Sequence, residues 1–317
     1  MSLLSARHLC KSYQIKSYQF AQKNQLDAIK DISFDLEKGK TLAIVGESGS
    51  GKSTLARQVI GIEKPTAGEV YFNNQVMQYN DKKMRRERFK NIRMIFQNPY
   101  ESLNPQARIG KMLEEVLRIN TRLTDKQRKE KVAETLSRVG LLSEHRHRYP
   151  HMFSGGQRQR IAIARAIILE PQVIIADEPL SALDVSIQAQ ILNLLQELQE
   201  EMGISYLFIS HDLNVVEHVA DDVMVMYRGE VVEQGTVAQI FDQPQHPYTQ
   251  TLFASTPMYN KRFKNLTSPN TRQKNIVSES GCGFAQRCDF CDSYCKTHSP
   301  KLETKSDGYK IACFKVK

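Results

Sequence analysis

The chain has 317 residues, of which 40% are hydrophobic and 25% charged, proportions that are ordinary for a globular protein. Its longest apolar stretch, residues 161–176, contains Arg165 and Glu170 and falls short of the roughly 18 apolar residues of a membrane helix. The first residues lack the long apolar segment of a secretion signal. We therefore expect a cytoplasmic protein with one large domain, or one domain and a smaller appendage.

The net charge of +9 is unevenly distributed, because residues 257–317 hold 12 Lys and Arg against 5 Asp and Glu. Such a tail can bind nucleic acid or anionic lipid, or can simply be solvated. Five of the six cysteines lie in the same segment, at positions 282, 288, 291, 295 and 313. Since disulfides are rare in a reducing cytosol, the clustered thiols indicate a metal. We expect the sixth, Cys10, to be a small core residue.

The first 61 residues predict strands, a glycine-rich loop and a helix. Residues 1–45 alternate as strands do, and the apolar run 41–45 predicts a buried strand. The segment Gly46-Glu-Ser-Gly-Ser-Gly-Lys-Ser-Thr54 follows it, and residues from Leu55 to Gly61 have a helical pattern. This order of strand, loop and helix makes the phosphate-loop motif credible.

Helices are predicted between about residues 98 and 160, as a subdomain inserted into an α/β core. Apolar residues at 109, 112, 113, 116 and 117 share one helical face. Thr124 and Gln127 predict a capping box for a second helix, which we expect to stop at Gly140.

The α/β pattern returns after Ile161. A strand over 173–176, a helix over 187–202 and a strand over 204–209 are followed by short strands over 223–227 and 230–233. The stretch 257–279 is rich in Lys, Asn, Ser and Thr and predicts a linker or an exposed excursion. We therefore expect a nucleotide-binding domain over 1–256 and a cysteine-bearing extension over 257–317.

The phosphate-loop residues predict the binding of ATP with Mg²⁺. Backbone N–H groups of the loop and of the following helix face the phosphates, Lys52 bridges the β- and γ-phosphates, and the Ser53 hydroxyl ligates Mg²⁺. Asp177 ends the strand 173–176 and Glu178 follows it. In this class of fold we expect Asp177 to hold Mg²⁺ through water and Glu178 to polarise the attacking water.

The segment Phe153-Ser-Gly-Gly-Gln157 resembles the signature of the ABC ATPases, commonly Leu-Ser-Gly-Gly-Gln, with Phe153 in place of Leu. In that family two cassettes pair head to tail, and the signature of one chain binds the ATP held by the other. The resemblance therefore implies a second ATPase subunit, identical or a paralogue. It assigns contact with the partner's ATP to Ser154, Gly155, Gly156 and Gln157.

Further motifs of the family occur in the family's order. Gln97 matches the Q-loop glutamine, which touches Mg²⁺ and water and senses the membrane partner, and Asp184 matches the D-loop. His211 matches the switch histidine at the γ-phosphate, and Tyr13 matches the aromatic that stacks on adenine. The resemblance assigns catalysis to Glu178, His211 and Gln97, Mg²⁺ to Ser53, Gln97 and Asp177, and ATP to Tyr13, Gly46, Ser48, Gly49, Gly51, Lys52, Ser53 and Thr54.

The C-terminal part resembles the ATPases of oligopeptide and dipeptide importers, which carry a His-Pro-Tyr-Thr motif, here at residues 246–249, and a cysteine-bearing tail. We expect an iron–sulfur cluster, [4Fe–4S], on Cys282, Cys288, Cys295 and Cys313. Zinc on four cysteines, Cys291 as a replacement ligand, and free surface thiols remain alternatives.

The sequence thus predicts an ATPase that powers peptide import from the cytoplasmic face of the inner cell membrane, as a peripheral subunit. The resemblance implies two permease subunits and an extracytoplasmic substrate-binding protein as partners, and no nucleic acid. The cargo stays open among dipeptides, longer peptides, haem and peptide antibiotics. The alternative is an ABC ATPase that acts on nucleic acid or ribosomes, which the basic charge allows. The long coiled coil of DNA-repair members is missing, because Gln97 and Ser154 are close in sequence.

Overall fold

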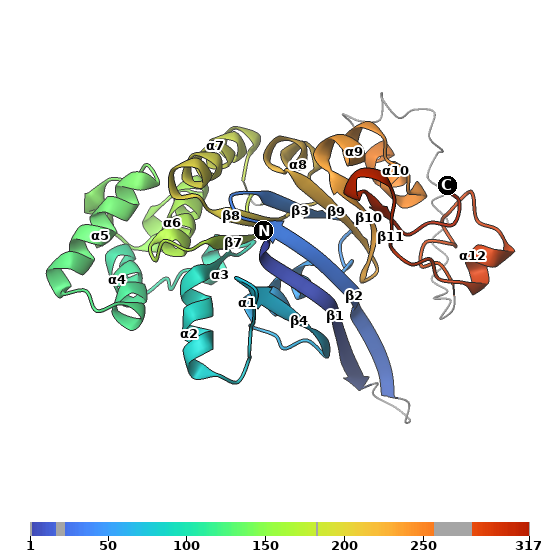
Figure 1. Cartoon of the computed structure of the whole chain (residues 1–317). Helices are drawn as coiled ribbons and strands as arrows, with labels where there is room; N and C mark the ends of the chain where they lie inside the picture. Colours follow the sequence, from blue (N-terminus) through green and yellow to red (C-terminus); the bar gives the residue numbers. More distant parts are fainter. Residues whose placement is uncertain (1, 17–22, 182, 257–280, 317) are drawn as a thin grey trace.

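The computed structural model describes residues 2–16, 23–181, 183–256 and 281–316. In this part of the chain two sheets and a set of helices build the fold (Figure 1). The fold class is the expected one: an α/β core with an antiparallel sheet, a helical segment and a small cysteine-bearing extension. The predicted linker over 257–279 lies outside the described residues.

The central sheet runs in the order β11-β12-β10-β9-β3-β8-β7-β6. Its parallel part contains β9 (Asp222–Tyr227), β3 (Thr41–Val45), β8 (Ser205–Ile209), β7 (Val173–Asp177) and β6 (Ile92–Ile95). Strands β10 (Glu230–Thr236), β12 (Lys310–Ile311) and β11 (Glu303–Thr304) continue it in antiparallel fashion. Strand β3 is buried at every position, as its unbroken apolar run predicts.

The second sheet is antiparallel and runs in the order β2-β1-β4-β5. It contains β2 (Lys23–Glu37), β1 (Ser2–Lys16), β4 (Ala67–Phe72) and β5 (Gln75–Val76). Its apolar side chains, among them Leu9 and Phe34, pack with Ile44 of β3 and Leu55 of α1 in one core cluster. Cys10 is only half-buried, and the expectation of a core cysteine is wrong.

The helices begin with α1 (Lys52–Ile60) and α2 (Lys82–Asn91). The next helices are α3 (Pro99–Ser102), α4 (Ile109–Asn120), α5 (Asp125–Arg138) and α6 (Gly155–Ile167), with short 3₁₀ turns at Ser143–His147 and Pro150–Met152. Of these, α4 and α5 lie at one end of the molecule (Figure 1). The remaining helices are α7 (Val185–Met202), α8 (Leu213–Val219), α9 (Val237–Asp242), α10 (Pro247–Ala254) and α12 (Ser293–Thr297), with a 3₁₀ turn at Ser306–Gly308.

Local signals placed both ends of α5 but not the start of α1. The capping box of Thr124 and Gln127 forms at the start of α5 as predicted, and Gly140, with a φ of 72°, directly follows the C-cap Val139, as expected for the glycine that stops the helix. Helix α1 begins at Lys52 rather than Leu55, because the last glycine of the loop is its N-cap.

The C-terminal extension is joined to the central sheet rather than appended to it. Strand β12 pairs with β10, so that Glu233 lies opposite Ile311, and the Ala312 N–H donates to the Val232 carbonyl over 2.9 Å. A separate core cluster unites Tyr248 of α10 with Phe284, Tyr309 and Ile311 of the extension. The extension therefore shares a core with the cassette.

Candidate functional site

The phosphate loop, residues 46–51, leads from β3 into α1. Gly46 and Gly51 have φ angles of 150° and 104°. A Cβ atom there would lie 2.2 Å from the Met226 carbonyl oxygen or 2.5 Å from that of Ala28. Glycine is therefore required at both ends of the loop. No side chain caps the start of α1, so its N–H groups are available to an anion.

Lys52, the first residue of α1, is 5% exposed. Its Nζ donates to the carbonyl oxygens of Gly46 and Glu47 over 2.7 and 2.9 Å. Burial lowers the pKa of Lys52, and the carboxylates of Glu178 and Asp177 oppose that shift. The ammonium group can exchange its two carbonyl partners for phosphate oxygens.

Asp177 ends β7 at the edge of the sheet where the parallel strands β3, β8 and β7 all end. Ser53 of α1 donates its hydroxyl to Asp177 Oδ1 over 3.1 Å. Burial raises the pKa of Asp177, and the hydrogen bond from Ser53 opposes this. A carboxylate beside a hydroxyl supplies the oxygen ligands that Mg²⁺ prefers, so this pair fits the predicted magnesium site.

Three side chains predicted to take part in hydrolysis meet at Glu178. Gln97 Nε2 donates to Glu178 Oε2 over 2.8 Å, and His211 Nδ1 lies 3.2 Å from the same oxygen. Gln97 follows β6 and His211 follows β8, so the ends of the parallel strands bring them together. Glu178 has φ of 46°, an uncommon conformation for a residue with a side chain, and its N–H donates to the Ile209 carbonyl over 2.9 Å.

The signature segment forms the start of α6. Ser154 Oγ accepts from the Gln157 N–H over 3.3 Å, and Gln157 Oε1 accepts from the Ser154 N–H over 3.1 Å. Gly156 packs on α7, where a Cβ would lie 2.6 Å from Cγ2 of Ile187. Ser154 and Gly155 are exposed. No hydrogen bond or ion pair among the described residues joins this segment to the phosphate loop of the same chain.

Tyr13 and Asp184 have partners of their own. The Tyr13 hydroxyl donates to both carboxylate oxygens of Glu63, over 2.9 and 2.8 Å, and Lys11 Nζ lies 5.1 Å from the ring centroid. Asp184 is the N-cap of α7 and accepts from the Ile187 N–H over 3.1 Å. Asp184 therefore also has a local structural role as a helix cap.

Sequence reasoning missed three residues at the edge of the phosphate loop. Glu47, within the loop, donates its N–H to the Tyr248 hydroxyl over 2.8 Å. Its carboxylate accepts two hydrogen bonds from Arg287, over 2.9 and 2.8 Å. Tyr248 belongs to the His-Pro-Tyr-Thr motif and Arg287 precedes Cys288, but neither pattern indicates a contact with the loop.

The five cysteines of the extension line one small pocket, together with apolar side chains that include Phe284 and Phe314. Burial is the main cause that raises the pKa of Cys282 and, to about 11, that of Cys288, and neighbouring thiols add to both shifts. In the described residues, however, no group of three or more His, Cys, Asp or Glu side chains is arranged to hold a single metal ion.

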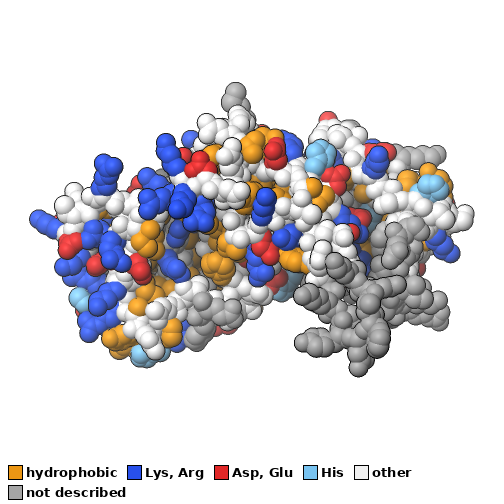
Figure 2. Space-filling view, turned by 90° about the horizontal axis from the view of Figure 1, so that it is seen from below, with side chains coloured by type: hydrophobic (Ala, Val, Ile, Leu, Met, Phe, Trp, Pro, Cys, Tyr) orange, Lys and Arg blue, Asp and Glu red, His pale blue; other side chains and the backbone are white. Residues whose placement is uncertain are grey.

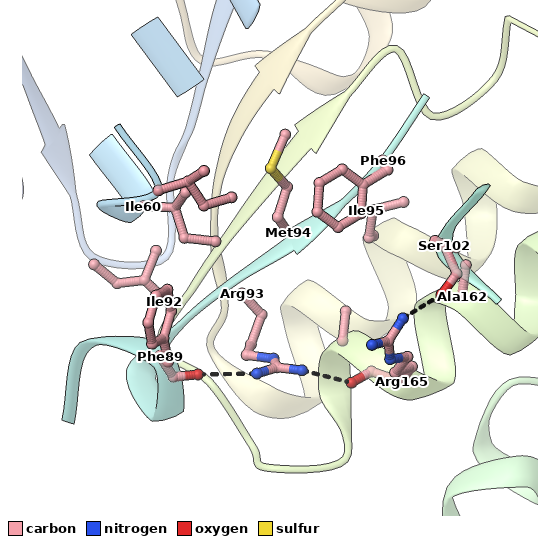
Figure 3. Close-up of a pocket in the computed structure, with 12 residues that line it drawn as sticks. Ile60, Phe89, Ile92, Arg93, Met94, Ile95, Phe96, Ser102, Ala162 and Arg165 are labelled. Atoms are coloured by element: carbon pink, nitrogen blue, oxygen red, sulfur yellow. Dashed lines mark hydrogen bonds between the residues drawn. The ribbon is translucent and has the colours of Figure 1, made fainter. Parts of the chain in front are cut away.

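A groove lies between β6 and α6, lined largely by apolar side chains (Figure 3). Two arginines line it as well. Arg93 donates to the carbonyl oxygens of Phe89 and Arg165 over 3.1 and 3.5 Å, and Arg165 donates to that of Ser102. Burial, and then the like charge of Arg165, lower the pKa of Arg93 to about 10. Neither guanidinium forms an ion pair with a carboxylate in the described part of the chain.

Lys and Arg side chains also gather over the half of one face that holds α2, α4 and α5 (Figure 2). Helix α2 alone exposes Lys82, Lys83, Arg85, Arg86 and Lys90. The positive charge is therefore not confined to the C-terminal extension. Across the described residues, no helix combines the length and the apolar character needed to cross a membrane.

Comparison with known proteins identifies the family. Residues 29–181 match the model of the ABC transporter family, and residues 232–295 match that of the oligopeptide/dipeptide transporter C-terminal region. The chain is 52% identical to the dipeptide transport ATP-binding protein DppF of Haemophilus influenzae, covering 99% of this chain and 97% of that protein. The corresponding protein of Escherichia coli is 51% identical, with coverage of 99% and 94%.

Solved structures agree with this result. A dimeric ATP-binding cassette in a post-hydrolysis state with ADP and phosphate is 30% identical, with a TM-score of 0.66 over 74% of this chain and 98% of that one. These similarities favour the predicted transport function over the nucleic-acid alternative. The chain therefore belongs to the ABC transporter family, as an ATP-binding subunit that carries the oligopeptide/dipeptide transporter C-terminal region.

Proposed function

We propose that this chain hydrolyses ATP to power the import of dipeptides or oligopeptides through a separate pair of permease subunits. The observation that carries the proposal is the meeting of Gln97 and His211 on Glu178, beside a phosphate loop. The names of the relatives, which are dipeptide transport proteins, support a peptide as the cargo. We place the subunit at the cytoplasmic face of the inner membrane, held there by the permeases.

In this proposal the ATP triphosphate lies on the N–H groups of the phosphate loop and the start of α1. Lys52 offsets the charge of the β- and γ-phosphates, and Tyr13 stacks on the adenine. The remaining contacts with ATP come from Gly46, Ser48, Gly49, Gly51, Ser53 and Thr54. Ser53, Asp177 and Gln97 would hold Mg²⁺, which neutralises phosphate charge when bound.

Hydrolysis depends on Glu178, which orients and polarises the attacking water. His211 contacts the γ-phosphate, and Gln97 holds the Glu178 carboxylate at the position where water arrives. Catalysis of this kind consists mainly of positioning and charge stabilisation. The exposed N-terminus of α6, with Ser154, offers a second anion site to the ATP of another ATPase subunit. We propose that this partner is a paralogue and that Asp184 lies at the interface between the two.

The proposal is tested with the complete importer reconstituted in lipid vesicles. Glu178→Gln should retain ATP binding but lose nearly all hydrolysis and uptake, because an amide cannot polarise water as a carboxylate does. In the wild-type importer and in the variant importer alike, the ATP site of the partner ATPase is disabled, so that the remaining ATP hydrolysis reports on this chain alone. Wild-type turnover in the variant would exclude the catalytic role of Glu178. Uptake of neither dipeptides nor longer peptides by the wild-type importer would exclude a peptide cargo.

We also propose that the groove between β6 and α6 receives a segment of a permease subunit. Phe96 and Ile62 at this groove are 40% and 53% exposed, and Gln97, which touches Glu178, directly follows Phe96. Arg93 and Arg165 have carbonyl partners but no carboxylate among the described residues. A docking segment with apolar side chains and a carboxylate would therefore match both the lining and the charge of this groove.

For the extension we propose a [4Fe–4S] cluster on Cys282, Cys288, Cys295 and Cys313. A zinc site needs four sulfurs at about 2.3 Å from one point. A cluster takes its ligands at separate corners, which suits thiols distributed around a pocket. When bound, iron would offset the mutual repulsion of the buried thiolates and would stabilise a segment with little core of its own.

Anaerobically purified protein should be brown and contain about four irons per chain. The Cys291→Ser variant should keep the colour, whereas Cys288→Ser should lose it. Colourless wild-type protein with one zinc per chain would exclude the cluster and retain a metal site. Metal-free protein with a folded extension would exclude both.

A further inference from the structure

Arg287 of the extension and Glu47 of the phosphate loop form a bidentate ion pair. The two guanidinium nitrogens Nη1 and Nη2 donate to Oε2 and Oε1 of Glu47 over 2.9 and 2.8 Å. The two residues are 240 positions apart. Both side chains are partly covered, with exposed fractions of 29% for Arg287 and 43% for Glu47. Two parallel hydrogen bonds of this kind fix the orientation of the Glu47 carboxylate as well as its distance from the guanidinium.

Aromatic side chains hold Arg287 in this position. Its guanidinium carbon lies 5.5 Å from the ring centroid of Phe284 and 5.9 Å from that of Tyr227. Phe284 packs edge-on against Tyr227 and contacts Tyr248, with centroids 5.4 and 5.5 Å apart. Phe284 is 2% exposed, so the ring on which Arg287 rests is part of the buried core that joins the extension to the cassette.

The backbone of Glu47 is fixed as well. Its N–H donates to the hydroxyl of Tyr248, which is fully buried, over 2.8 Å. Its carbonyl oxygen accepts from Lys52 at the start of α1 and from the Ser50 N–H of the loop. The N–H and the carboxylate of this one loop residue are thus both held by residues that come after β10 in the chain.

The pairing also has an electrostatic consequence. A carboxylate in a loop that binds a polyphosphate repels the ligand, and the repulsion is strongest in a partly dry site. Arg287 places a positive charge directly on this carboxylate. Without the arginine, Glu47 would be free to turn towards the phosphates and to compete for Lys52.

We propose that Arg287 of the extension and Tyr248 of α10 are positioning residues for the phosphate loop, and that through Arg287 the cysteine-bearing extension sets the affinity of the site for ATP. The inference rests on the proposed ATP site and adds a contribution from the extension to it. Arg287 compensates the charge of Glu47, and Tyr248 fixes the loop backbone. The extension is then required for tight nucleotide binding as well as for a stable fold.

The test measures binding of MgATP to the full-length chain by titration calorimetry, together with hydrogen exchange of residues 46–51. Arg287→Ala should weaken ATP binding about tenfold, the loss expected for one charge-assisted interaction, and should speed exchange in the loop. Arg287→Lys keeps the charge without the bidentate geometry and should lie between wild type and Arg287→Ala. Lys305→Ala removes another cation of the extension, paired with Glu303, and is the matched control.

A second substitution separates charge compensation from a general loss of structure. If Arg287 acts through the carboxylate, Glu47→Gln should restore most of the affinity in the Arg287→Ala background, because the uncompensated charge is gone. Tyr248→Phe removes only the hydroxyl and should speed loop exchange without lowering the melting temperature by as much as Tyr248→Ala. In the assembled importer, Arg287→Ala should raise KM for ATP more than it lowers kcat.

Three results would overturn the inference: unchanged ATP affinity in Arg287→Ala, an equal loss in Lys305→Ala, or no recovery with Glu47→Gln. Failure of the wild-type chain to bind MgATP would instead refute the proposed function. The two failures can be told apart, because the role of Arg287 is judged only by the affinity of the variants relative to a wild-type chain that itself binds ATP.

Discussion

The ring and the hydroxyl of Tyr13 can be tested separately, because the hydroxyl has a partner of its own in Glu63. Tyr13→Ala should weaken ATP binding by about 1–3 kcal/mol, the range of base–aromatic stacking. Tyr13→Phe keeps the ring and should bind ATP nearly as the wild type does. Calorimetric titration with MgATP measures both.

Tyr71→Phe is a suitable control, since Tyr71 also donates to a glutamate, Glu69, in an exposed hydrogen bond on β4. If Tyr13→Phe and Tyr13→Ala lost the same affinity, the hydroxyl rather than the ring would matter. The stacking role would then be wrong.

At the same scale, the sequence predicted those site residues whose chemistry is encoded locally. The phosphate loop, the Asp177-Glu178 pair and the signature each occupy a short stretch, and the end of a parallel strand tells where the carboxylates must lie. The contact of Glu47 with Arg287 could not be found in this way. It joins distant positions through a core whose packing no local pattern reports.

At the scale of elements, helix starts were more predictable than the edges of the sheet. A capping box needs only a hydroxyl and an amide three residues apart, and both Thr124 and Ser154 form one with the glutamine that follows. Strand β12 has two residues and shows no periodicity. Its pairing with β10 depends on a buried network around Glu233 and was not predicted.

That network makes the docking of the extension dependent on pH. His246, the N-cap of α10, accepts the Tyr248 backbone N–H on its ring nitrogen Nδ1, and the backbone N–H of His246 donates to the carboxylate of Glu233. Burial lowers the pKa of His246 to about 4, and the Ala312 backbone partly opposes this. Burial raises the pKa of Glu233, whose carboxylate also accepts from the Tyr309 hydroxyl.

The sign for His246 follows from these values. Below its ordinary pKa of 6.5 the unfolded chain takes up a proton that the native imidazole rejects until about pH 4. The free energy of unfolding that neutral His246 contributes is therefore fully present above pH 6.5, and it is lost as the pH falls from 6.5 towards about 4. The loss should reach roughly 2 kcal/mol at pH 5. The raised pKa of Glu233 acts in the opposite direction, because its native form protonates first.

Urea denaturation at pH 7 and pH 5 isolates the histidine when the wild type is compared with His246→Gln. The free energy of unfolding of the wild type should exceed that of the variant by less at pH 5 than at pH 7. A difference that did not change with pH would contradict the lowered pKa of His246.

At the scale of the whole molecule, the groove of Figure 3 predicts a separation between assembly and nucleotide binding. Arg165→Glu should repel a carboxylate of the permease segment and abolish copurification with the permeases, while ATP binding by the isolated chain is retained. Retained binding also shows that the variant is folded.

Lys126→Glu reverses a charge on α5, where the side chain is 87% exposed, and should leave assembly intact. Equal loss of assembly in the two variants would mean that general charge, rather than the groove, attracts the permeases. Copurification of Arg165→Glu at the wild-type level would rule out the groove as the docking site.

The addition of β12 to β10 also affects how the protein is made. Translation produces residues 310–311 long after β10, so β10 remains an uncovered sheet edge until β12 has been made. Nascent chains, and products of premature termination after residue 256, therefore expose a strand that can pair with a neighbouring copy. The pairing of β12 with β10 removes this route to aggregation.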